Sequence, residues 1–530
     1  MAAEVLAARS GAGGVFLGLP TMATTDAMFS RLRAWIDRLP VQGPVSLQLA
    51  HSKGQLNEEF AALPRQLPIT GVLDESGTDR SCVIAANWLQ SRKRGTLATF
   101  VVGTIDQALF VALQAKHVML RHLALSGKVV VIDEVHAADD YMRIYLTSAL
   151  AWLGRYGVPV VLLSATLPSH QRCELVAAYS RGLGEELQLE PAASYPCLTV
   201  VGPGRADSVP VEATGPSMRL EVQGLSDDLQ ELIEYVARVT SDGGVVGIVR
   251  NTVARAQDAY RVLRERFAED EVLLLHSRFL APHRAARESL LRSMLGPRGA
   301  RPHRLIVVGT QVLEQSLDVD FDLLISDLAP VDLLLQRVGR LHRHPRSRPP
   351  HLQVPRLLIT GYQPGEAGGP PTLEPGGRAV YGTSLLLRTA AAINLGDTGD
   401  ASGVEHHSFV ELPGEIRSLV ERVYAETPYV PAAWLAEVRT ADEARSREIL
   451  DARQRAETFC LPAAPRAHQC LNSFLNVSLD EDAVGQRQVR DGEEGLEVLA
   501  IQRVAGELRL LPQIGEHSGQ RIPDLGPPGS

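Results

Sequence analysis

The most informative segment of this chain is Val129-Val-Val-Ile-Asp-Glu-Val-His136. Its apolar residues predict a strand that is buried on both faces, which is typical of a parallel sheet. Asp133 and Glu134 follow at once, so two carboxylates lie at the carboxyl end of this strand. This is typical of nucleotide-hydrolysing sites, in which one carboxylate lies beside Mg²⁺ and the next orients the attacking water. For this segment alone, a strand that ends in acidic turn residues is the alternative.

A second apolar strand runs into Ser164-Ala-Thr166. Small hydroxyl side chains at the end of a neighbouring strand can hydrogen-bond the acidic site and respond to its state. The tripeptide is uninformative by itself, but its position after the Asp-Glu strand makes it specific. We therefore predict that Ser164 and Thr166 sense the state of the acidic site.

A third segment, Gln336-Arg-Val-Gly-Arg-Leu-His-Arg343, places three arginines and a glutamine around one helical turn. A basic cluster on a helix is often only a solvated surface. Arginine also stabilises the charge of a phosphoryl group during its transfer, so Arg340 and Arg343 are candidates for that role.

Strands and helices alternate in two stretches of the chain, and this alternation predicts an α/β fold with two similar halves. In the first half we predict strands over 15–19, 98–102, 128–132 and 158–163 and helices over 27–39, 107–118 and 142–156. In the second half we predict strands over 244–249, 271–275, 304–308 and 322–325 and helices over 229–239, 254–266 and 333–338. Residues from about 200 to 217 are rich in Gly, Pro and Ser and are predicted to link the halves. Further on, 379–393 and 413–425 are predicted as helices and 496–511 as a short hairpin.

Composition excludes several classes of protein. The chain has 530 residues, of which 45% are hydrophobic and 22% charged, as in ordinary globular proteins. It has no apolar run long enough to span a bilayer and no secretory signal pattern, so no membrane partner is expected. Its five cysteines form no Cys-x-x-Cys pair, which favours reduced thiols in a cytoplasmic protein. The net charge of −9 does not exclude nucleic acid, because binding requires only a local basic surface.

Taken together, the three segments resemble the DEAH/DEVH type of superfamily-two helicases. Further segments narrow the resemblance to the CRISPR-associated DEVH-box helicase–nuclease that Cascade recruits in type I systems, most closely subtype I-E. These segments are Gly18-Leu-Pro-Thr-Met-Ala-Thr-Thr-Asp-Ala-Met-Phe29, Val102-Gly-Thr-Ile-Asp-Gln107, Lys116-His-Val-Met-Leu-Arg121, Gly127-Lys-Val-Val-Val-Ile-Asp-Glu-Val-His-Ala137 and Val308-Gly-Thr-Gln-Val-Leu-Glu-Gln-Ser-Leu-Asp-Val-Asp-Phe-Asp322. The resemblance implies two tandem RecA-like domains with a mainly helical C-terminal region.

The resemblance also implies residue roles. Asp133 would hold Mg²⁺ through ATP, Glu134 would activate water, and His136 and Gln336 would couple nucleotide to nucleic acid. Ser164 and Thr166 would transmit hydrolysis to strand movement. Arg340 and Arg343 would complete the ATP site, with Asp318 near the ribose. Residues in the motifs that touch single-stranded DNA would be Thr21, Thr104, Gln107, Arg250, Asn251, Thr252, His276, Ser277, Arg278 and Thr310. A threonine at such positions can equally cap a helix.

The sequence lacks the expected phosphate-binding loop. That loop needs Gly-rich backbone, then Lys, then Ser or Thr. Only four lysines occur, and the one Gly-Lys pair, Gly127-Lys128, opens the Asp-Glu strand. The sequence also has no His-Asp dipeptide, so the family's metal-dependent HD nuclease is not expected in it. A truncated or misassigned reading frame, a split gene whose other chain carries the nuclease and loop, and a decaying gene all remain open.

These observations predict the following organisation. Residues 1–204 form the first RecA-like domain, 205–217 a linker, 218–360 the second RecA-like domain, 361–378 a Pro/Gly-rich insertion, 379–515 a helical region or linker, and 516–530 a flexible tail. The predicted function is that of an ATP-dependent DNA helicase in antiviral defence. The alternatives are another superfamily-two translocase and a non-catalytic nucleic-acid-binding subunit.

Overall fold

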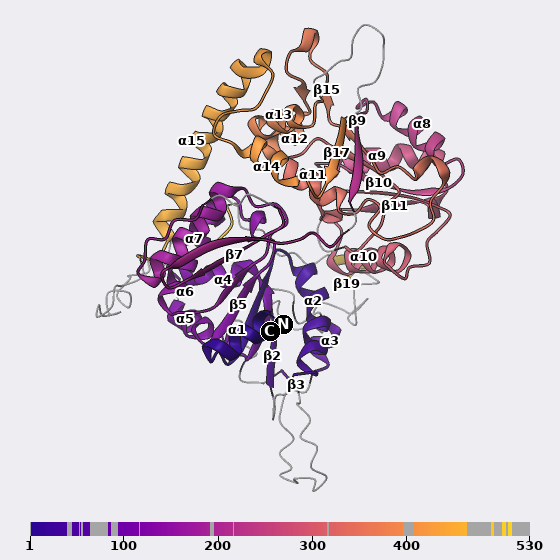
Figure 1. The fold of residues 1–530 in the computed structure, drawn as a ribbon. Helices are drawn as coiled ribbons and strands as arrows, with labels where there is room; N and C mark the ends of the chain where they lie inside the picture. Colours follow the sequence, from indigo (N-terminus) through magenta and orange to yellow (C-terminus); the bar gives the residue numbers. More distant parts are fainter. Residues whose placement is uncertain are drawn as a thin grey trace. The chain divides into compact units, whose positions relative to one another are not determined.

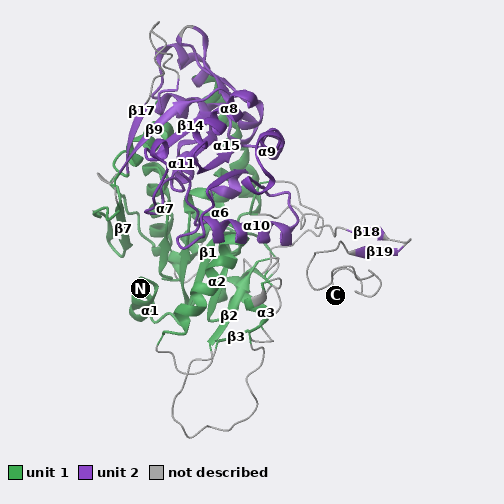
Figure 2. Cartoon of the chain, turned by 90° about the vertical axis from the view of Figure 1, so that its right-hand side faces the viewer, with its two compact units in different colours: residues 1–217, 413–428, 439–491 green, residues 218–412, 429–438, 492–530 purple. Residues whose placement is uncertain are grey.

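The fold is that of a computed structural model, which describes residues 2–39, 45–51, 54, 57–63, 83–85, 89, 94–115, 117–190, 195–215, 217–314, 317–395, 408–463, 489–491, 501–504 and 507–510. The chain forms two compact units (Figure 2). The first unit takes residues 1–217, 413–428 and 439–491, and the second takes 218–412, 429–438 and 492–530. Each unit therefore combines segments that are far apart in the sequence.

The first unit is built on a six-stranded sheet in the order β3-β2-β4-β1-β5-β6, and all its pairings are parallel. The strands are β1 (Gly14–Leu19), β2 (Val45–Ala50), β3 (Val83–Ile84), β4 (Phe100–Thr104), β5 (Lys128–Ile132) and β6 (Val160–Leu162). The strand predicted over 128–132 agrees with β5 residue for residue. Among the described strands, none pairs with the outer side of β6, whose residues are all half-buried. The prediction of burial on both faces therefore holds for β5 better than for β6.

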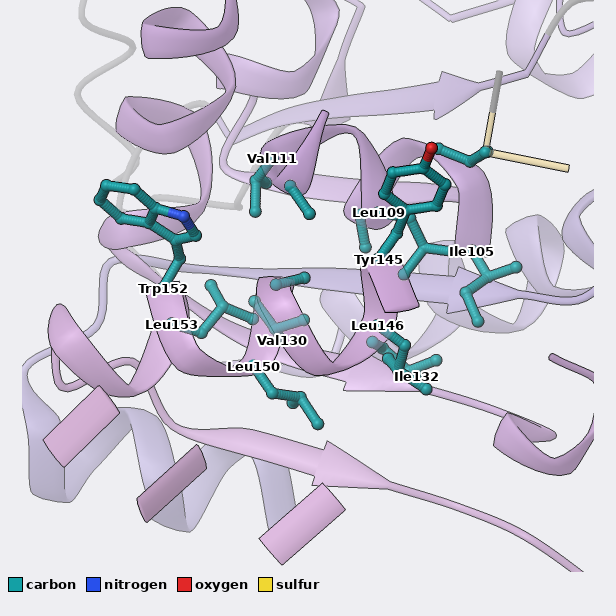
Figure 3. Packing of buried hydrophobic residues seen from close by; sticks show 14 of the residues in the cluster. Ile105, Leu109, Val111, Val130, Ile132, Tyr145, Leu146, Leu150, Trp152 and Leu153 are labelled. Carbon is teal, nitrogen blue, oxygen red and sulfur yellow. The ribbon is translucent and has the colours of Figure 1, made fainter. Parts of the chain in front are cut away.

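Helices cover both faces of this sheet, because alternate side chains of the strands belong to different cores. Val130 and Ile132 of β5 pack with α4 (Ile105–Leu109) and α6 (Asp140–Arg155), and Figure 3 shows this cluster around Tyr145 and Trp152. Val129 packs in a second cluster with α2 (Met22–Ile36). The unit also holds α1 (Ala2–Ser10), α3 (Glu58–Ala61), α5 (Val118–Ser126) and α7 (Ser169–Leu183).

Two glycines allow α6 and α7 to pack closely (Figure 1). A Cβ atom added at Gly182 would lie 2.1 Å from the carbonyl oxygen of Ala151, and one added at Gly154 would lie 2.4 Å from that of Tyr179. The backbones of the two helices therefore approach at a distance that only glycine permits.

The C-terminal part of the chain returns to the first unit. It contributes α14 (Ile416–Tyr424) and residues 439–459 of α15 (Leu435–Phe459). Ala452 and Ala456 of α15 are buried in the cluster of Figure 3. The hydroxyl of Tyr145 donates to the carbonyl oxygen of Ala456 at 3.1 Å. Part of the predicted helical C-terminal region thus belongs to the hydrophobic core of the first unit.

Two local predictions for the first unit differ from the structure. The helix predicted over 107–118 is broken, because Leu113 forms a bridge with Cys460 and the amide of Gln114 donates to Phe459 at 2.8 Å. These contacts with the end of α15 override the helical periodicity. The predicted linker overlaps an antiparallel hairpin of β7 (Cys197–Gly202) and β8 (Arg205–Pro210), whose first strand begins before it. A tight turn at Gly204, with φ of 69°, explains why Gly-rich sequence was interpreted as a linker.

The second unit has a seven-stranded sheet in the order β11-β12-β10-β13-β14-β9-β17. Its strands are β9 (Met218–Gly224), β10 (Gly244–Val249), β11 (Val272–Leu275), β12 (Arg304–Gly309), β13 (Leu323–Asp327), β14 (Arg356–Thr360) and β17 (Ser408–Leu412). Only β17 is antiparallel to its neighbour. Its helices are α8 (Leu229–Val239), α9 (Val253–Arg266), α10 (Ala281–Leu295), α11 (Val331–Val338), α12 (Pro375–Tyr381) and α13 (Thr383–Ala392). The predicted α/β fold class is confirmed for both units.

Several small elements complete the description. Two-residue strands β15 (Tyr362–Gln363) and β16 (Thr372–Leu373) pair within the predicted Pro/Gly-rich insertion. The hairpin predicted over 496–511 is confirmed by β18 (Ile501–Val504) and β19 (Glu507–Leu510). The tail predicted over 516–530 lies outside the described residues. None of the described helices combines the length and the apolar character needed to cross a membrane.

Candidate active site and nucleic-acid interface

The Asp-Glu pair lies where β5 ends, next to β1. The amide of Asp133 donates to the carbonyl oxygen of Gly18 at 2.9 Å, and the amide of Glu134 donates to the Asp133 carboxylate at 3.0 Å. Burial raises the pKa of Asp133, and the hydrogen bond from Glu134 opposes that rise only in part. A carboxylate whose charged form is disfavoured by burial gains from a nearby cation.

Glu134 adopts an uncommon backbone conformation, with φ of 53°. Residues other than glycine seldom adopt positive φ, and such residues cluster at functional sites. Its side chain is 40% exposed, whereas that of His136 is 3% exposed. Glu134 therefore reaches solvent from a fixed backbone, as a residue that orients a water molecule must.

The structure brings the first two sequence segments together. Nδ1 of His136 lies 2.9 Å from Oγ of Ser164 and 3.4 Å from Oε2 of Glu134. The imidazole thus bridges the predicted water-activating carboxylate and the Ser164-Ala-Thr166 segment. Thr166 itself is buried, at 4% exposure, and its hydroxyl has no partner among the described residues.

Lys128 does not substitute for a phosphate-binding lysine. It is 6% exposed, and its ammonium group donates to the carbonyl oxygens of Thr96, at 3.0 Å, and Ala124. Burial lowers its pKa to about 8. Its side chain points into the protein, which agrees with the sequence interpretation of Gly127-Lys128.

The predicted DNA-binding residues of the first unit follow β1 and β4. Thr21 caps α2, because its hydroxyl accepts from the amide of Thr24 at 3.2 Å. Thr104 is buried just before α4 and makes no side-chain cap. Gln107 accepts a hydrogen bond from Arg121 at 3.1 Å. Thr21 therefore has a structural role as a cap, whatever its role in DNA binding.

In the second unit, the segment Arg250-Asn251-Thr252 lies at the end of β10. The Arg250 guanidinium is 1% exposed and donates to Asp327 at 2.8 Å. Asn251 also binds Asp327, through its amide at 2.9 Å, and Thr252 caps α9. In this structure Arg250 and Asn251 bind protein groups, so the geometry favours a structural role for them over direct phosphate contact.

The segment after β11 differs in exposure. His276 is buried at 4% and stacks on Phe279 with ring centroids 4.3 Å apart. Ser277 and Arg278 are exposed, and Thr310 after β12 is buried at 2%. Ser277 and Arg278 are thus the exposed members of the predicted contacts of this unit, and Thr252 is half-buried.

The third sequence segment begins in α11. Gln336 is half-buried. Arg340 donates to the carbonyl oxygen of Glu314 at 2.8 Å, and Arg343 donates to Asp318 at 2.7 Å. The predicted ribose-side aspartate and a predicted phosphate-side arginine are therefore ion-paired with each other.

Comparison with known proteins indicates the family of this chain. A family model described as "CRISPR-associated nuclease/helicase Cas3, C-terminal" matches residues 242–346. A Cas3 nuclease/helicase of Streptococcus thermophilus is 36% identical over 524 residues, covering 95% of this chain and 54% of that protein. This chain belongs to the Cas3 family.

Solved structures extend the comparison to the fold. The crystal structure of T. fusca Cas3 with AMPPNP gives a TM-score of 0.78 at 34% identity, covering 92% of this chain and 54% of that chain. A CRISPR RNA-guided surveillance complex in the pre-nicking state gives a TM-score of 0.68 at 32% identity, covering 89% of this chain and 51% of that chain. These matches confirm the predicted resemblance and the two tandem RecA-like domains. The chain spans about half the length of the Cas3 relatives it matches.

The sequence reasoning missed one of the two most deeply buried arginines among the described residues of the Cas3-like second unit. Arg337 is 1% exposed and pairs with Glu314 at 2.6 Å, and it also donates to Ser326 at 2.7 Å. It lies three residues before Arg340 in the same basic segment. Its place in α11 between the apolar residues Leu334 and Val338 was the available signal that it faces inward.

Arg490 is a second residue that sequence reasoning missed. Its guanidinium, 52% exposed, donates to Asp106 at 2.9 Å and to the carbonyl oxygen of Pro20 at 3.1 Å. It therefore lies beside the segments of Thr21 and Gln107, although it is far from them in the sequence. No local pattern around Arg490 indicates this position.

Proposed function

We propose that this chain is the motor core of a Cas3-type, ATP-dependent DNA helicase or translocase that acts in CRISPR antiviral defence. The observation that carries the proposal is the contact of His136 with Ser164 at 2.9 Å, beside Glu134. It joins an acidic nucleotide site to a neighbouring strand end, as coupling of hydrolysis to strand movement requires.

ATP with Mg²⁺ is the proposed cofactor, as the AMPPNP-bound T. fusca relative suggests. Bound ATP would supply the phosphoryl group and Mg²⁺ would neutralise its charge. Asp133 fits this role, because burial disfavours its charge in the absence of a cation. Glu134 would orient water, and Arg340, Arg343 and Asp318 are the proposed nucleotide-binding residues of the second unit.

Single-stranded DNA is the proposed substrate, and a Cascade surveillance complex is the proposed partner, since one structural relative is such a complex. Contacts of Ser277 and Arg278 with phosphates would be independent of base sequence and strongly dependent on salt. A separate chain that carries the HD nuclease and the phosphate-binding loop is a further proposed partner.

The test is ATP turnover by the purified chain, with and without single-stranded DNA. We expect DNA binding with little or no turnover, because this sequence offers no lysine in a phosphate-binding loop. Glu134→Gln is the control. Turnover that disappears in Glu134→Gln would contradict this expectation and would show that the chain builds a phosphate site in another way.

The same protein tests the DNA interface. Arg278→Gln should weaken binding to oligonucleotides of any sequence and reduce the salt dependence by about one phosphate contact. Arg261→Gln is the matched control, since Arg261 is 71% exposed and pairs with Asp258 in the same unit. If neither variant changes DNA binding, the exposed segment after β11 is not part of the interface.

A non-catalytic nucleic-acid-binding subunit is the second candidate, because the sequence lacks the loop that turnover requires. The two candidates differ in one result. If the chain is the motor core, adding a partner chain that carries the phosphate-binding loop restores ATP turnover that is stimulated by DNA and depends on Glu134. If the chain is a non-catalytic subunit, the added partner does not restore such turnover.

A further inference from the structure

Residues 489–491 come from the C-terminal part of the chain but belong to the first unit. Val489 anchors this short segment, because it is 4% exposed and belongs to the hydrophobic cluster of Figure 3. Asp491 anchors the segment a second time, through an ion pair with Arg455 of α15. Arg490 lies between these two anchors, so its position on the unit is fixed from both sides.

The guanidinium of Arg490 contacts two of the segments in which DNA-binding residues are predicted. Its Nη2 donates to the carbonyl oxygen of Pro20, directly before Thr21, at 3.1 Å. Its Nε donates to the carboxylate of Asp106, directly before Gln107, at 2.9 Å. Its Nη1 makes no hydrogen bond within the described part of the chain, and the side chain is 52% exposed. A ligand in solvent can therefore reach this arginine.

A second arginine reaches the same end of α4. Arg121 of α5 is half-buried and donates to the Gln107 side chain at 3.1 Å, and its guanidinium lies 4.3 Å from the ring centre of Phe110. Burial lowers the pKa of Arg121, and no carboxylate among the described residues forms an ion pair with it. Arg121, Arg490 and Asp106 together therefore carry a net positive charge.

The chemistry of this arrangement suits a phosphodiester. Arginine binds phosphate oxygens as well as carboxylate oxygens, with hydrogen bonds that its charge strengthens. An exposed pair of arginine and aspartate is only weakly stable, so a phosphate can compete with Asp106 for the guanidinium of Arg490. The charge of Arg490 remains compensated after such an exchange.

We propose that Arg490 is a contact of the first unit with the backbone phosphates of single-stranded DNA, and that Asp106 competes with the phosphate for it. Arg121 adds positive charge on the adjacent residue Gln107. This inference rests on the proposed function, because it names a further contact for the same DNA strand. It also gives the C-terminal part of the chain a share in the DNA interface.

The experiment measures the fluorescence anisotropy of a labelled single-stranded oligonucleotide with the purified chain over a range of salt concentrations. Arg490→Gln should weaken binding about fivefold and reduce the slope of log affinity against log salt by about 0.7, the effect of one lost phosphate contact. Asp106→Asn should strengthen binding about twofold or more, because it removes the competing carboxylate.

The opposite signs of these two effects separate a DNA contact from a structural tie. If the ion pair only holds the segment on the unit, both variants loosen the segment and both weaken binding, which overturns the inference. Arg455→Gln is the matched control, because Arg455 is 53% exposed and its ion pair with Asp491 holds the same segment. We expect Arg455→Gln to bind DNA as the parent does, and weakening equal to that of Arg490→Gln would overturn the inference.

The outcomes also distinguish this inference from the proposed function. If the parent binds DNA and Arg490→Gln binds it equally well with an unchanged salt slope, the inference alone is wrong. If the parent binds no single-stranded DNA, both the inference and the proposed function are wrong. Circular dichroism checks that the three variants fold as the parent does.

Discussion

Asp327 is the residue on which the polar interior of the second unit converges. It is completely buried, and it accepts from Arg250 at 2.8 Å, from the amide of Asn251 at 2.9 Å and from Arg255 at 2.9 Å. Burial alone would raise its pKa, but the two guanidinium groups outweigh burial and hold the pKa well below the usual range. Removing its charge would leave the buried Arg250 with only the longer contact to Asp227, at 3.4 Å, as a carboxylate partner among the described residues.

We therefore expect Asp327→Asn to lower the free energy of unfolding by about 3 kcal/mol or more at pH 7. Because the folded-state pKa lies below the ordinary value, this contribution is present above pH 3.8 and is lost only as the pH falls below it. Urea unfolding measures the change. Asp258→Asn, which alters an aspartate 46% exposed, is the control and should change stability by less than about 0.5 kcal/mol.

Lys128, unlike Asp327, makes a destabilising contribution to the free energy of unfolding, and this contribution depends on pH. Its pKa falls from 10.5 to about 8 on folding, because its ammonium group is buried. Between those pH values the unfolded chain binds more protons than the folded chain, so stability should rise with pH. We expect Lys128→Met to remove this rise, which is of the order of 3 kcal/mol. Urea unfolding at pH 7.5 and 9.5 tests this prediction. If the free energy of unfolding changes equally with pH in the parent and in Lys128→Met, the prediction is wrong.

Sequence alone placed Asp133, Glu134 and Ser164 at one edge of the sheet, because each follows an apolar strand and strand ends of a parallel sheet meet at one edge. It did not identify Arg337, whose neighbours Arg340 and Arg343 look alike in sequence. The arginine of a basic helix that faces the interior is the one that finds partners there. For Arg337 these partners are Glu314 and Ser326, which come from other parts of the chain.

At the scale of elements, α7 depends on α14 for its first turn. The residue before α7 is Pro168, which makes no side-chain cap. The amide of Ser169 is instead satisfied by Glu421, at 2.9 Å, from a helix 252 positions later in the chain. An N-terminal helix cap is typically worth about 1 kcal/mol.

We expect Glu421→Ala to free the first turn of α7, so that its amides exchange with deuterium about fivefold faster. Hydrogen exchange followed by mass spectrometry of peptides over 167–173 measures this. Glu426→Ala, an exposed glutamate just beyond α14, should leave the exchange unchanged. Identical exchange in both variants would show that Glu421 does not cap α7.

Element boundaries were predictable where the apolar pattern was clear. The strands β5 and β10 are almost continuously apolar, and the helix α8 has one apolar face. Boundaries were not predictable where a distant segment intervened. Leu113 leaves the helical path because the end of α15 pairs with it. The strand β17 joins the sheet of the second unit beside β9, although its sequence follows the Pro/Gly-rich insertion and the helices α12 and α13.

At the scale of the whole molecule, the order of segments in sequence is not their order in space. The predicted C-terminal region supplies α14 and most of α15 to the first unit, and β17 to the second. The low hydrophobic content of α15 gave no sign that it completes a core. The deciding contacts are those of Ala456, which is fully buried, and of Leu461, whose amide donates to Ala112 at 2.7 Å.

This organisation predicts that a single change in α15 selectively weakens the first unit. Ala456→Asp would place an unpaired charge in the core of Figure 3 and should destabilise that unit by about 3 kcal/mol or more. Ala444→Asp, on the exposed side of the same helix, is the matched control. In differential scanning calorimetry, Ala456→Asp should lower the transition that Asp327→Asn leaves in place, because the two residues lie in separate units. If both variants lower one common transition, the two units unfold as a single cooperative body, and the prediction of selective weakening is wrong.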